Sequence, residues 1–216
     1  MGYVVNELKG GQISAPDAVT YLQQVLTYVK RQGVLLLIEP ALQETALRLQ
    51  QVRDGLVQQG LLPLSPCTHL NSCPLAAPNR PARQWCHEEL QWQRPPLVEA
   101  VDRLTGLDKE RAAFSHLLMQ RNSTSGDAEL SQKGSSEPPP LRVMSPALRA
   151  NGTMSVYVCG PEGFGEAMRL NRHKTLENSA LDGLKRGDVI RLYPVHNKGG
   201  KWRVEAETQV DVLSEA

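Results

Sequence analysis

The spacing of apolar residues in the first sixty positions predicts alternating strands and helices. Residues 3–8 have an apolar start and are expected to form a short strand and the turn after it. Apolar side chains then recur at helical intervals from Val19 to Val29. Ser14 is placed to cap this helix, and Pro16 suits its first turn.

A continuous apolar run at residues 34–38 predicts a strand covered on both faces in a parallel sheet. Apolar residues from Leu42 to Leu56 then indicate a second amphipathic helix, which Gly60 should end. Strand, helix, strand, helix is the pattern of a doubly wound α/β sheet. Two parallel strands alone do not make a stable domain, so we expect residues 1–62 to be part of a larger Rossmann-like sheet.

The amino-acid composition of the chain changes twice after residue 62. Residues 63–120 begin with a Pro-rich stretch and continue into a segment expected to be helical in part, with Phe114 and Leu117 apolar. Residues 121–140 are rich in Ser, Gly and Pro, and we expect them to form a mobile loop. Residues 141–216 hold short apolar or alternating runs between Gly turns, which predicts a β-rich C-terminal portion.

Composition and charge narrow the classes of partner. The 216 residues include 24 Lys and Arg and 23 Asp and Glu, so any nucleic-acid contact must come from local basic patches. No apolar run approaches the ~20 residues of a membrane helix, and we expect no membrane association. The sequence starts without a secretory signal pattern, which favours a reducing compartment. In such a compartment cysteines are more often ligands or free thiols than disulfides.

The four cysteines come from two distant parts of the chain. Cys67, Cys73 and Cys86 lie in the Pro-rich stretch, separated by five and twelve residues, whereas Cys159 follows after seventy-two more. Thiols from two distant segments predict a four-ligand metal site that ties these segments together. Unrelated buried thiols or disulfides are the alternatives, but a loop rich in Pro and Arg is not typical of an apolar core.

The cysteine spacing leaves the identity of the metal open. Zinc sites usually contain cysteine pairs separated by two to four residues, and none occurs here. Iron–sulfur clusters accept looser spacing, and a ligand followed by proline, as in Cys73-Pro74, occurs in ferredoxin-type sites. His69 and His87 could each replace a cysteine, so zinc remains an alternative.

Seven short motifs occur in a characteristic order along the chain. They are VVNEL at 4–8, GVLLLIEP at 33–40, PCTH at 66–69, CPLA at 73–76, WCH at 85–87, FSHLL at 114–118 and VCGPEG at 158–163. In this order the chain resembles the ribosomal small-subunit-associated methyltransferase-like family, which includes bacterial proteins and the mitochondrial ribosome-assembly methyltransferase-like protein. The resemblance spans nearly the whole chain, and the cysteine motifs are its specific part.

The resemblance implies a class I methyltransferase fold, of which this chain is similar to the C-terminal half. It also implies an iron–sulfur cluster, expected to be 4Fe–4S, with four ligands: Cys67, Cys73, Cys86 and Cys159. The glycine-rich turn for S-adenosylmethionine is expected to be absent, so that cofactor would bind only in a full-length protein and enzymatic activity stays open. The implied location is the mitochondrial matrix in a eukaryote or the cytoplasm in a bacterium.

Two further groups of residues are candidate binding sites. Asn6 and Glu39 stand at the carboxyl ends of predicted strands, where open α/β sheets bind ligands, although turn and capping roles are equally compatible. Basic residues near the cysteines and in the C-terminal portion form two local groups that are candidate contacts to ribosomal RNA: Arg80, Arg83, Arg169, Arg172 and Lys174. A solvated surface is the ordinary role of such charges, and we expect no DNA partner.

These observations support several functions of different classes. The first is a factor that binds small-subunit ribosomal RNA during assembly, with a structural cluster shaping its surface. The second is an S-adenosylmethionine-dependent RNA methyltransferase, and a zinc-stabilised RNA-binding module is a further alternative. A redox-sensing cluster is a weaker hypothesis.

Overall fold

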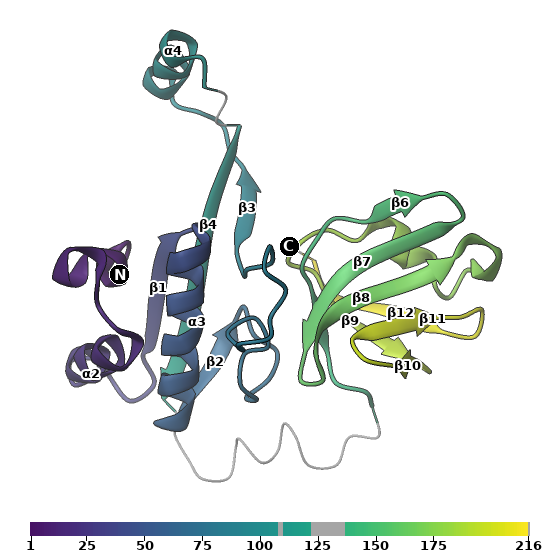
Figure 1. Ribbon diagram of the computed structural model, residues 1–216, viewed down its shortest axis with the longest axis horizontal. Coiled ribbons are helices and arrows are strands. Elements are labelled where there is room, and N and C mark those ends of the chain that lie inside the picture. Colours follow the sequence, from purple (N-terminus) through teal and green to yellow (C-terminus); the bar gives the residue numbers. More distant parts are fainter. Residues whose placement is uncertain (108–109, 122–136, 216) are drawn as a thin grey trace.

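Two β-sheets, each with its own apolar core, make up the computed structural model, and a cysteine-rich loop lies between them (Figure 1). The structure describes residues 1–107, 110–121 and 137–215. The protein is a mixed α/β protein, as the sequence predicts. None of the described helices is long and apolar enough to cross a membrane. The predicted mobile loop at 121–140 falls largely on residues that lie outside the described ranges.

The N-terminal lobe contains most of the helices. Its elements are α1 (Val4–Glu7), a 3-10 turn (Leu8–Gly11), α2 (Ala15–Leu26), β1 (Val34–Pro40), α3 (Gln43–Gln58), β2 (Leu61–Ser65), β3 (Glu88–Gln91), α4 (Pro96–Thr105) and β4 (Arg111–Arg121). Strand β4 lies between β1 and β2 and is antiparallel to both, so β1 and β2 run parallel to each other with α3 connecting them. Strand β3 pairs with the far end of β4.

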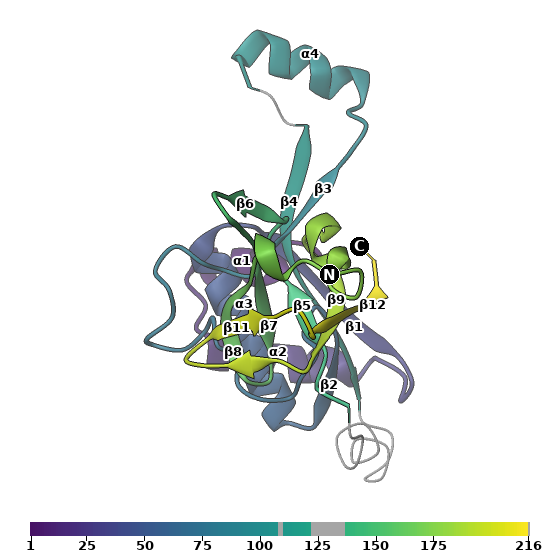
Figure 2. The same cartoon turned by 90° about the vertical axis from the view of Figure 1, so that its right-hand side faces the viewer.

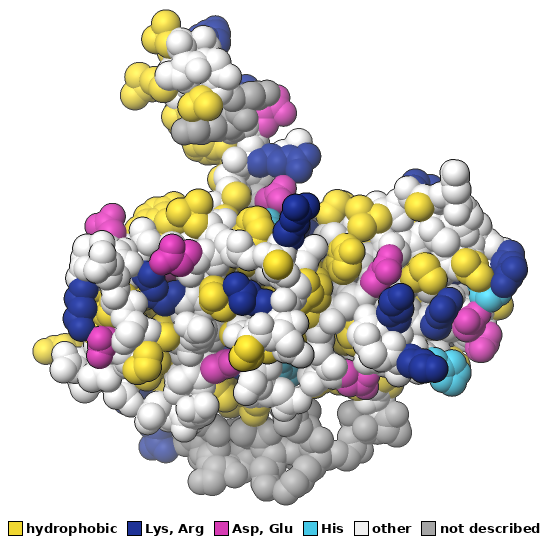
Figure 3. All heavy atoms as spheres, in the orientation of Figure 1, with side chains coloured by type: hydrophobic (Ala, Val, Ile, Leu, Met, Phe, Trp, Pro, Cys, Tyr) yellow, Lys and Arg dark blue, Asp and Glu magenta, His cyan; other side chains and the backbone are white. Residues whose placement is uncertain are grey.

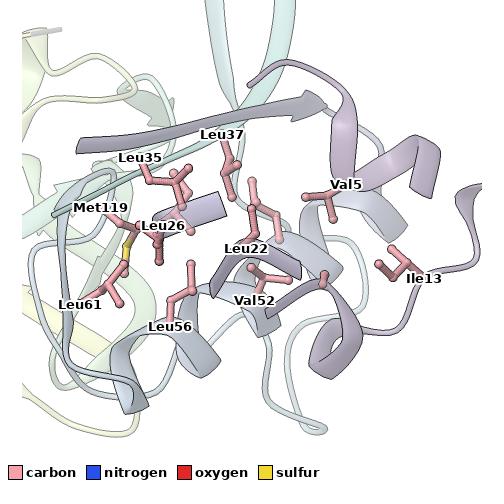
Figure 4. Packing of buried hydrophobic residues seen from close by; sticks show 13 residues of the cluster. Val5, Ile13, Leu22, Leu26, Leu35, Leu37, Val52, Leu56, Leu61 and Met119 are labelled. Carbon is pink, nitrogen blue, oxygen red and sulfur yellow. The ribbon is translucent and has the colours of Figure 1, made fainter. Parts of the chain in front are cut away.

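The core of this lobe forms where α2 and α3 cover one face of the sheet (Figure 4). Leu22 of α2 and Val52 and Leu56 of α3 are fully buried against Leu37 of β1 and Met119 of β4. The predicted cap of α2 is confirmed, because the Ser14 hydroxyl accepts a hydrogen bond from the backbone N–H of Asp17. Apolar periodicity therefore located both helices correctly.

The prediction of a short strand and turn at residues 3–8 is correct only as far as Tyr3, and the residues after it are helical. Only residues 1–3 run alongside β1, where the Tyr3 N–H donates to the Ile38 carbonyl at 2.7 Å. The chain then turns into α1, because the buried Glu39 carboxylate accepts hydrogen bonds from the backbone N–H groups of Val5 and Asn6. Two amides at a helix start are satisfied by an acceptor thirty-four residues away, which local sequence patterns do not show.

The prediction of a strand covered on both faces at residues 34–38 is wrong. Strand β1 alternates, with Leu35 and Leu37 buried, whereas Val34 and Leu36 remain 49% and 39% exposed. Its full-length partner is the antiparallel strand β4. The helices cover one face of this strand only, and a continuous apolar run does not distinguish that case from burial on both faces.

Strands β3 and β4 extend beyond the sheet as an arm that carries α4 at its tip, well away from both lobes (Figures 1 and 2). The expectation of partial helix in this region is confirmed for α4, but Phe114 and Leu117 lie on β4. This strand belongs to the sheet of the N-terminal lobe through its pairing with β1 and β2. The domain boundaries at 62 and 120 stay predictions, although β4 links the two segments that they separate.

The predicted β-rich C-terminal portion is confirmed. Its strands are β5 (Leu141–Val143), β6 (Leu148–Ala150), β7 (Thr153–Gly160), β8 (Gly163–Leu170), β9 (Val189–Tyr193), β10 (His196–Asn197), β11 (Lys201–Val204) and β12 (Gln209–Ser214). Two short 3-10 turns, Asn171–His173 and Ser179–Gly183, separate β8 from β9. The sheet curls around a core that includes Val156, Ile190 and Trp202.

Candidate metal centre

All four cysteines line one cavity between the two lobes. Cys67, Cys73 and Cys86 reach it from the loop that follows β2, and Cys159 reaches it from the end of β7. Apolar and cationic side chains complete its wall, among them Leu49, Leu75, Leu117, Met144, Arg53 and Arg142. The structure thus brings together the two distant segments that the sequence analysis connected.

Helix α3 holds the part of the loop that carries the first two cysteines. Both carboxylate oxygens of Asp54 accept the backbone N–H of Cys73 at 3.0 Å. The neighbouring Arg53 donates to the backbone carbonyls of His69 and Asn71. These contacts fix a Pro-rich loop that has few large apolar side chains of its own.

Other elements position the remaining two cysteines. The Ser115 hydroxyl, on β4, donates to the carbonyl of Cys86 at 2.8 Å. Cys159 stands opposite Arg142 in the register of β7 and β5. Cys73 and Cys86 are therefore attached to α3 and β4, and Cys159 is itself part of β7.

Two further hydrogen bonds join the loop to the C-terminal lobe. The Thr68 hydroxyl donates to the carbonyl of Pro140 at 3.0 Å, and the Asn71 amide donates to the carbonyl of Pro161 at the same distance. The residues around the first two cysteines are thereby connected to the segment before β5, through Pro140, and to the turn between β7 and β8, through Pro161. The cavity wall consequently spans both lobes.

The arrangement of the sulfur atoms bears on the kind of metal centre. All four cysteines are free. Among the described residues, no group of three or more His, Cys, Asp or Glu side chains is close enough to hold a metal ion. Four sulfurs around one zinc stand roughly 3.8 Å apart, because each Zn–S bond is about 2.3 Å. The four thiols share a cavity without forming such a site among the described residues, so a metal centre, and the choice between zinc and an iron–sulfur cluster, stays a prediction.

Burial makes the thiolate forms of these cysteines unfavourable without a bound cation. Loss of solvation raises the pKa of Cys73 and of Cys86 to about 12. It also raises the pKa of Cys67 and moves that of Cys159 well above its usual value. A metal centre favours thiolates and overcomes this cost, whereas a nucleophilic cysteine needs a lowered pKa. The four cysteines are therefore not activated as nucleophiles, and their role as metal ligands stays a prediction.

The arginines of the cavity wall also fit a sulfur-rich centre. Burial raises the pKa of Cys67, and the guanidinium groups of Arg53 and Arg142 partly oppose this rise because they favour the thiolate. The Nε atoms of both arginines are buried and have no hydrogen-bond partner within the described ranges. Cluster and cysteine sulfurs accept such hydrogen bonds. The residues present are therefore compatible with an iron–sulfur cluster held by the four cysteines.

The histidines differ in their relation to the cavity. His69 is buried and lines it, and burial lowers the pKa of its imidazole. His87 instead stacks on Trp85 and lies 3.3 Å from Glu89. Sequence reasoning missed His116, which lines the cavity and shares a 2.8 Å hydrogen bond with Ser65.

Sequence reasoning also missed Arg53 and Arg142. A signal for Arg53 exists, because it falls within the apolar stripe of α3 formed by Leu49, Val52 and Leu56. A cation at a helix position that faces the core needs a buried partner. No comparable pattern marks Arg142, which lies on a strand of three residues.

The candidate cofactor site at Asn6 and Glu39 has a structural explanation. Asn6 and Glu39 lie together, but both Glu39 oxygens accept backbone N–H groups, one of them from Asn6 itself. Glu39 therefore has a structural role at the start of α1, and its role in cofactor binding stays a prediction. Burial raises the pKa of this carboxyl above its usual value.

One of the proposed RNA contacts needs correction. Arg169 is only 1% exposed and donates to the Asn178 side chain and carbonyl and to Asp182. A buried guanidinium with these partners is not available to RNA. Arg83, Arg172 and Lys174 are exposed, whereas Arg80 is partly buried, and all four stay predictions.

A family model described as "Mitochondrial small ribosomal subunit Rsm22" matches residues 2–186. No curated protein matches the chain closely enough to count as a relative. The matched range includes the helices, the arm, all four cysteines and Arg142. The chain therefore belongs to the mitochondrial small ribosomal subunit Rsm22 family, a methyltransferase-like family.

Proposed function

We propose that this chain is a cluster-containing factor of the small ribosomal subunit that binds ribosomal RNA during assembly in the mitochondrial matrix. The observation that carries the proposal is the common cavity of Cys67, Cys73, Cys86 and Cys159. Family membership supplies the association with the small ribosomal subunit. The four cysteines would hold a 4Fe–4S cluster, and zinc is the alternative.

The role of the centre in this proposal is structural. All four cysteines serve as ligands, so no open coordination position is left for a substrate. The centre would fix the loop between the two lobes and thereby hold the surfaces of both in one arrangement. The N-terminal sheet is consistent with part of a class I methyltransferase fold, because mixed sheets are common among doubly wound proteins.

Anaerobic purification followed by iron and sulfide analysis tests the nature of the centre. We expect about four iron and four sulfide per chain and a brown protein, as the cluster formula requires. Cys159→Ser should abolish iron binding. Val158→Ala is the matched control, since Val158 is the fully buried neighbour of Cys159 and the change should lower stability but keep the iron. One zinc and no iron would favour the alternative.

RNA binding is the part of the proposal that concerns the surface. Lys, Arg and His side chains appear on the C-terminal lobe, interspersed with acidic ones (Figure 3). Arg172 and Lys174 belong to this lobe and follow β8. We expect Arg172→Gln to weaken binding to small-subunit RNA and to reduce the salt dependence of binding, because a phosphate contact releases counterions. Equal affinity and salt dependence in both proteins would contradict this assignment.

Methylation of RNA is the second candidate function, and the parallel β1 and β2 with α3 between them favour it. Titration calorimetry with S-adenosylmethionine separates the two candidates. We expect no heat of binding for this chain, since backbone amides already occupy the Glu39 carboxylate. Tight binding would establish the methyltransferase alternative.

A further inference from the structure

We propose that Arg53 and Arg142 are positioning residues of the cysteine centre. On this view they hold the ligand segments together before the metal arrives, and their positive charges stabilise the negatively charged centre afterwards. This inference rests on the proposed function, because it requires a thiolate-bound centre in the cavity. It concerns two residues that lie outside the cysteine motifs.

Arg142 contacts three of the four ligand segments. It stands directly opposite Cys159 in the pairing of β5 with β7. Its Nη1 donates to the carbonyl of Pro66, the residue before Cys67, at 3.1 Å. Its Nη2 forms an ion pair with Glu88, which follows Cys86 by two positions. One side chain thus connects the C-terminal lobe to both ends of the cysteine loop.

Arg53 has the corresponding role in the remaining part of the loop. It donates to the carbonyls of His69 and Asn71, which lie between Cys67 and Cys73. It also pairs with Asp54 at 2.7 Å, and Asp54 accepts the backbone N–H of Cys73. The two arginines together contact the segments that carry all four cysteines.

Because both arginines are buried, their positive charges act strongly on a centre in the cavity. The side chains of Arg53 and Arg142 are 2% and 8% exposed, so water does little to screen them. A centre with four thiolates is anionic, and adding an electron makes it more so. Cations in the cavity wall therefore favour the reduced form, and charge and hydrogen bonds to sulfur are established determinants of cluster potential.

The test measures the midpoint potential of the purified protein in a dithionite titration, in which each cluster gains one electron. We expect Arg142→Gln to bind iron but to be reduced about tenfold less favourably, a shift of about 59 mV to lower potential for a one-electron couple. Arg142→Lys keeps the charge and should remain near the wild-type potential. Arg53→Gln is the second variant, expected to shift the potential in the same direction.

Arg169→Gln is the matched control. Arg169 is as buried as Arg53 and also forms an ion pair, but it does not line the cavity. Its loss should lower stability without moving the potential. Unchanged potentials in Arg142→Gln and Arg53→Gln, or shifts no larger than in Arg169→Gln, would overturn this inference while leaving the proposed function intact. A wild-type protein without iron and sulfide would overturn both.

Discussion

Buried arginines distinguish this chain at the level of single residues. Arg53 and Arg142 face the cysteine cavity, whereas Arg169 supports the 3-10 turns of the C-terminal lobe through Asn178 and Asp182. In the sequence only Arg53 carries a signal of burial, from its place in the apolar stripe of α3, whereas Arg142 and Arg169 look like ordinary surface cations. Their different roles depend largely on distant partners, such as Asn178, nine residues from Arg169, and Pro66, seventy-six residues from Arg142.

Arg169→Met tests the structural role of this side chain. The change removes two hydrogen bonds to Asn178, whose side-chain oxygen keeps only the backbone N–H of Thr175 as a donor. It leaves Asp182 with Lys174 as its remaining cation. We expect a loss of about 3 kcal/mol in the free energy of unfolding, measured by urea denaturation. Arg172→Met, at an exposed position, should change stability by less than about 0.5 kcal/mol. Equal effects of the two changes would contradict the burial of Arg169.

Glu39 gives stability a specific dependence on pH. Burial raises the pKa of the folded carboxyl above its usual 4.5, so folding favours the protonated form. The folded state therefore binds more protons than the unfolded state between the two pKa values, and stability falls as pH rises through the folded pKa. Relative to Glu39→Gln, which cannot titrate, wild-type stability should decline from pH 4.5 upwards. Parallel curves for the two proteins would exclude this effect.

At the level of elements, the apolar periodicity correctly predicted those elements that short-range sequence patterns determine. The helices α2 and α3 and the β-rich C-terminal portion appear as expected, because each buries a repeating apolar face. The predictions failed where a distant partner decides the structure. Residues 4–7 form a helix because the Glu39 carboxylate accepts hydrogen bonds from backbone N–H groups of that helix. Residues 111–121 form a strand because β1 and β2 pair with it on either side.

The candidate site likewise has parts that the sequence could predict and parts that it could not. The four cysteines were predictable because thiols are rare and their loop is unlike a core. Their common cavity depends on the pairing of β5 with β7, which places Cys159 beside a loop more than seventy residues earlier. Arg142 could not be predicted, since its role exists only once that pairing has formed.

The contact between β8 and β11 depends on a glycine. A Cβ atom at Gly165 would overlap the carbonyl oxygen of Gly200, which accepts the backbone N–H of Glu166 at 2.9 Å. Gly165→Ala should therefore cost more than about 2 kcal/mol by thermal or urea unfolding. Gly183→Ala is the control, because a Cβ there meets nothing within 4 Å, and it should stay within about 0.5 kcal/mol of wild type. Similar stability of the two variants would mean that β11 can move away without penalty.

At the level of the whole molecule, the two lobes have separate cores and meet around the cysteine loop. A third, small apolar cluster joins them, with Cys73 and Leu75 from the loop packed against Met144 of the C-terminal lobe. This cluster has three buried residues and five partly buried ones packed against them, far fewer buried residues than either core, so it supplies less hydrophobic stabilisation than each of them. The proposed metal centre would therefore supply much of the coupling between the lobes.

Removal of the metal centre tests this coupling. We expect the loaded protein to unfold in one cooperative transition by calorimetry, and the protein after oxidative cluster removal to unfold in two, one for each core. The first midpoint should fall by about 2–4 °C for each kcal/mol of lost coupling. Limited proteolysis should then cut the loop between Pro66 and His87, which the loaded protein protects because its ligands fix the backbone. A single transition at an unchanged midpoint after metal removal, with the loop still protected, would contradict this prediction. It would show that side-chain contacts, such as those of Arg142, Thr68 and Asn71, join the lobes without help from a metal.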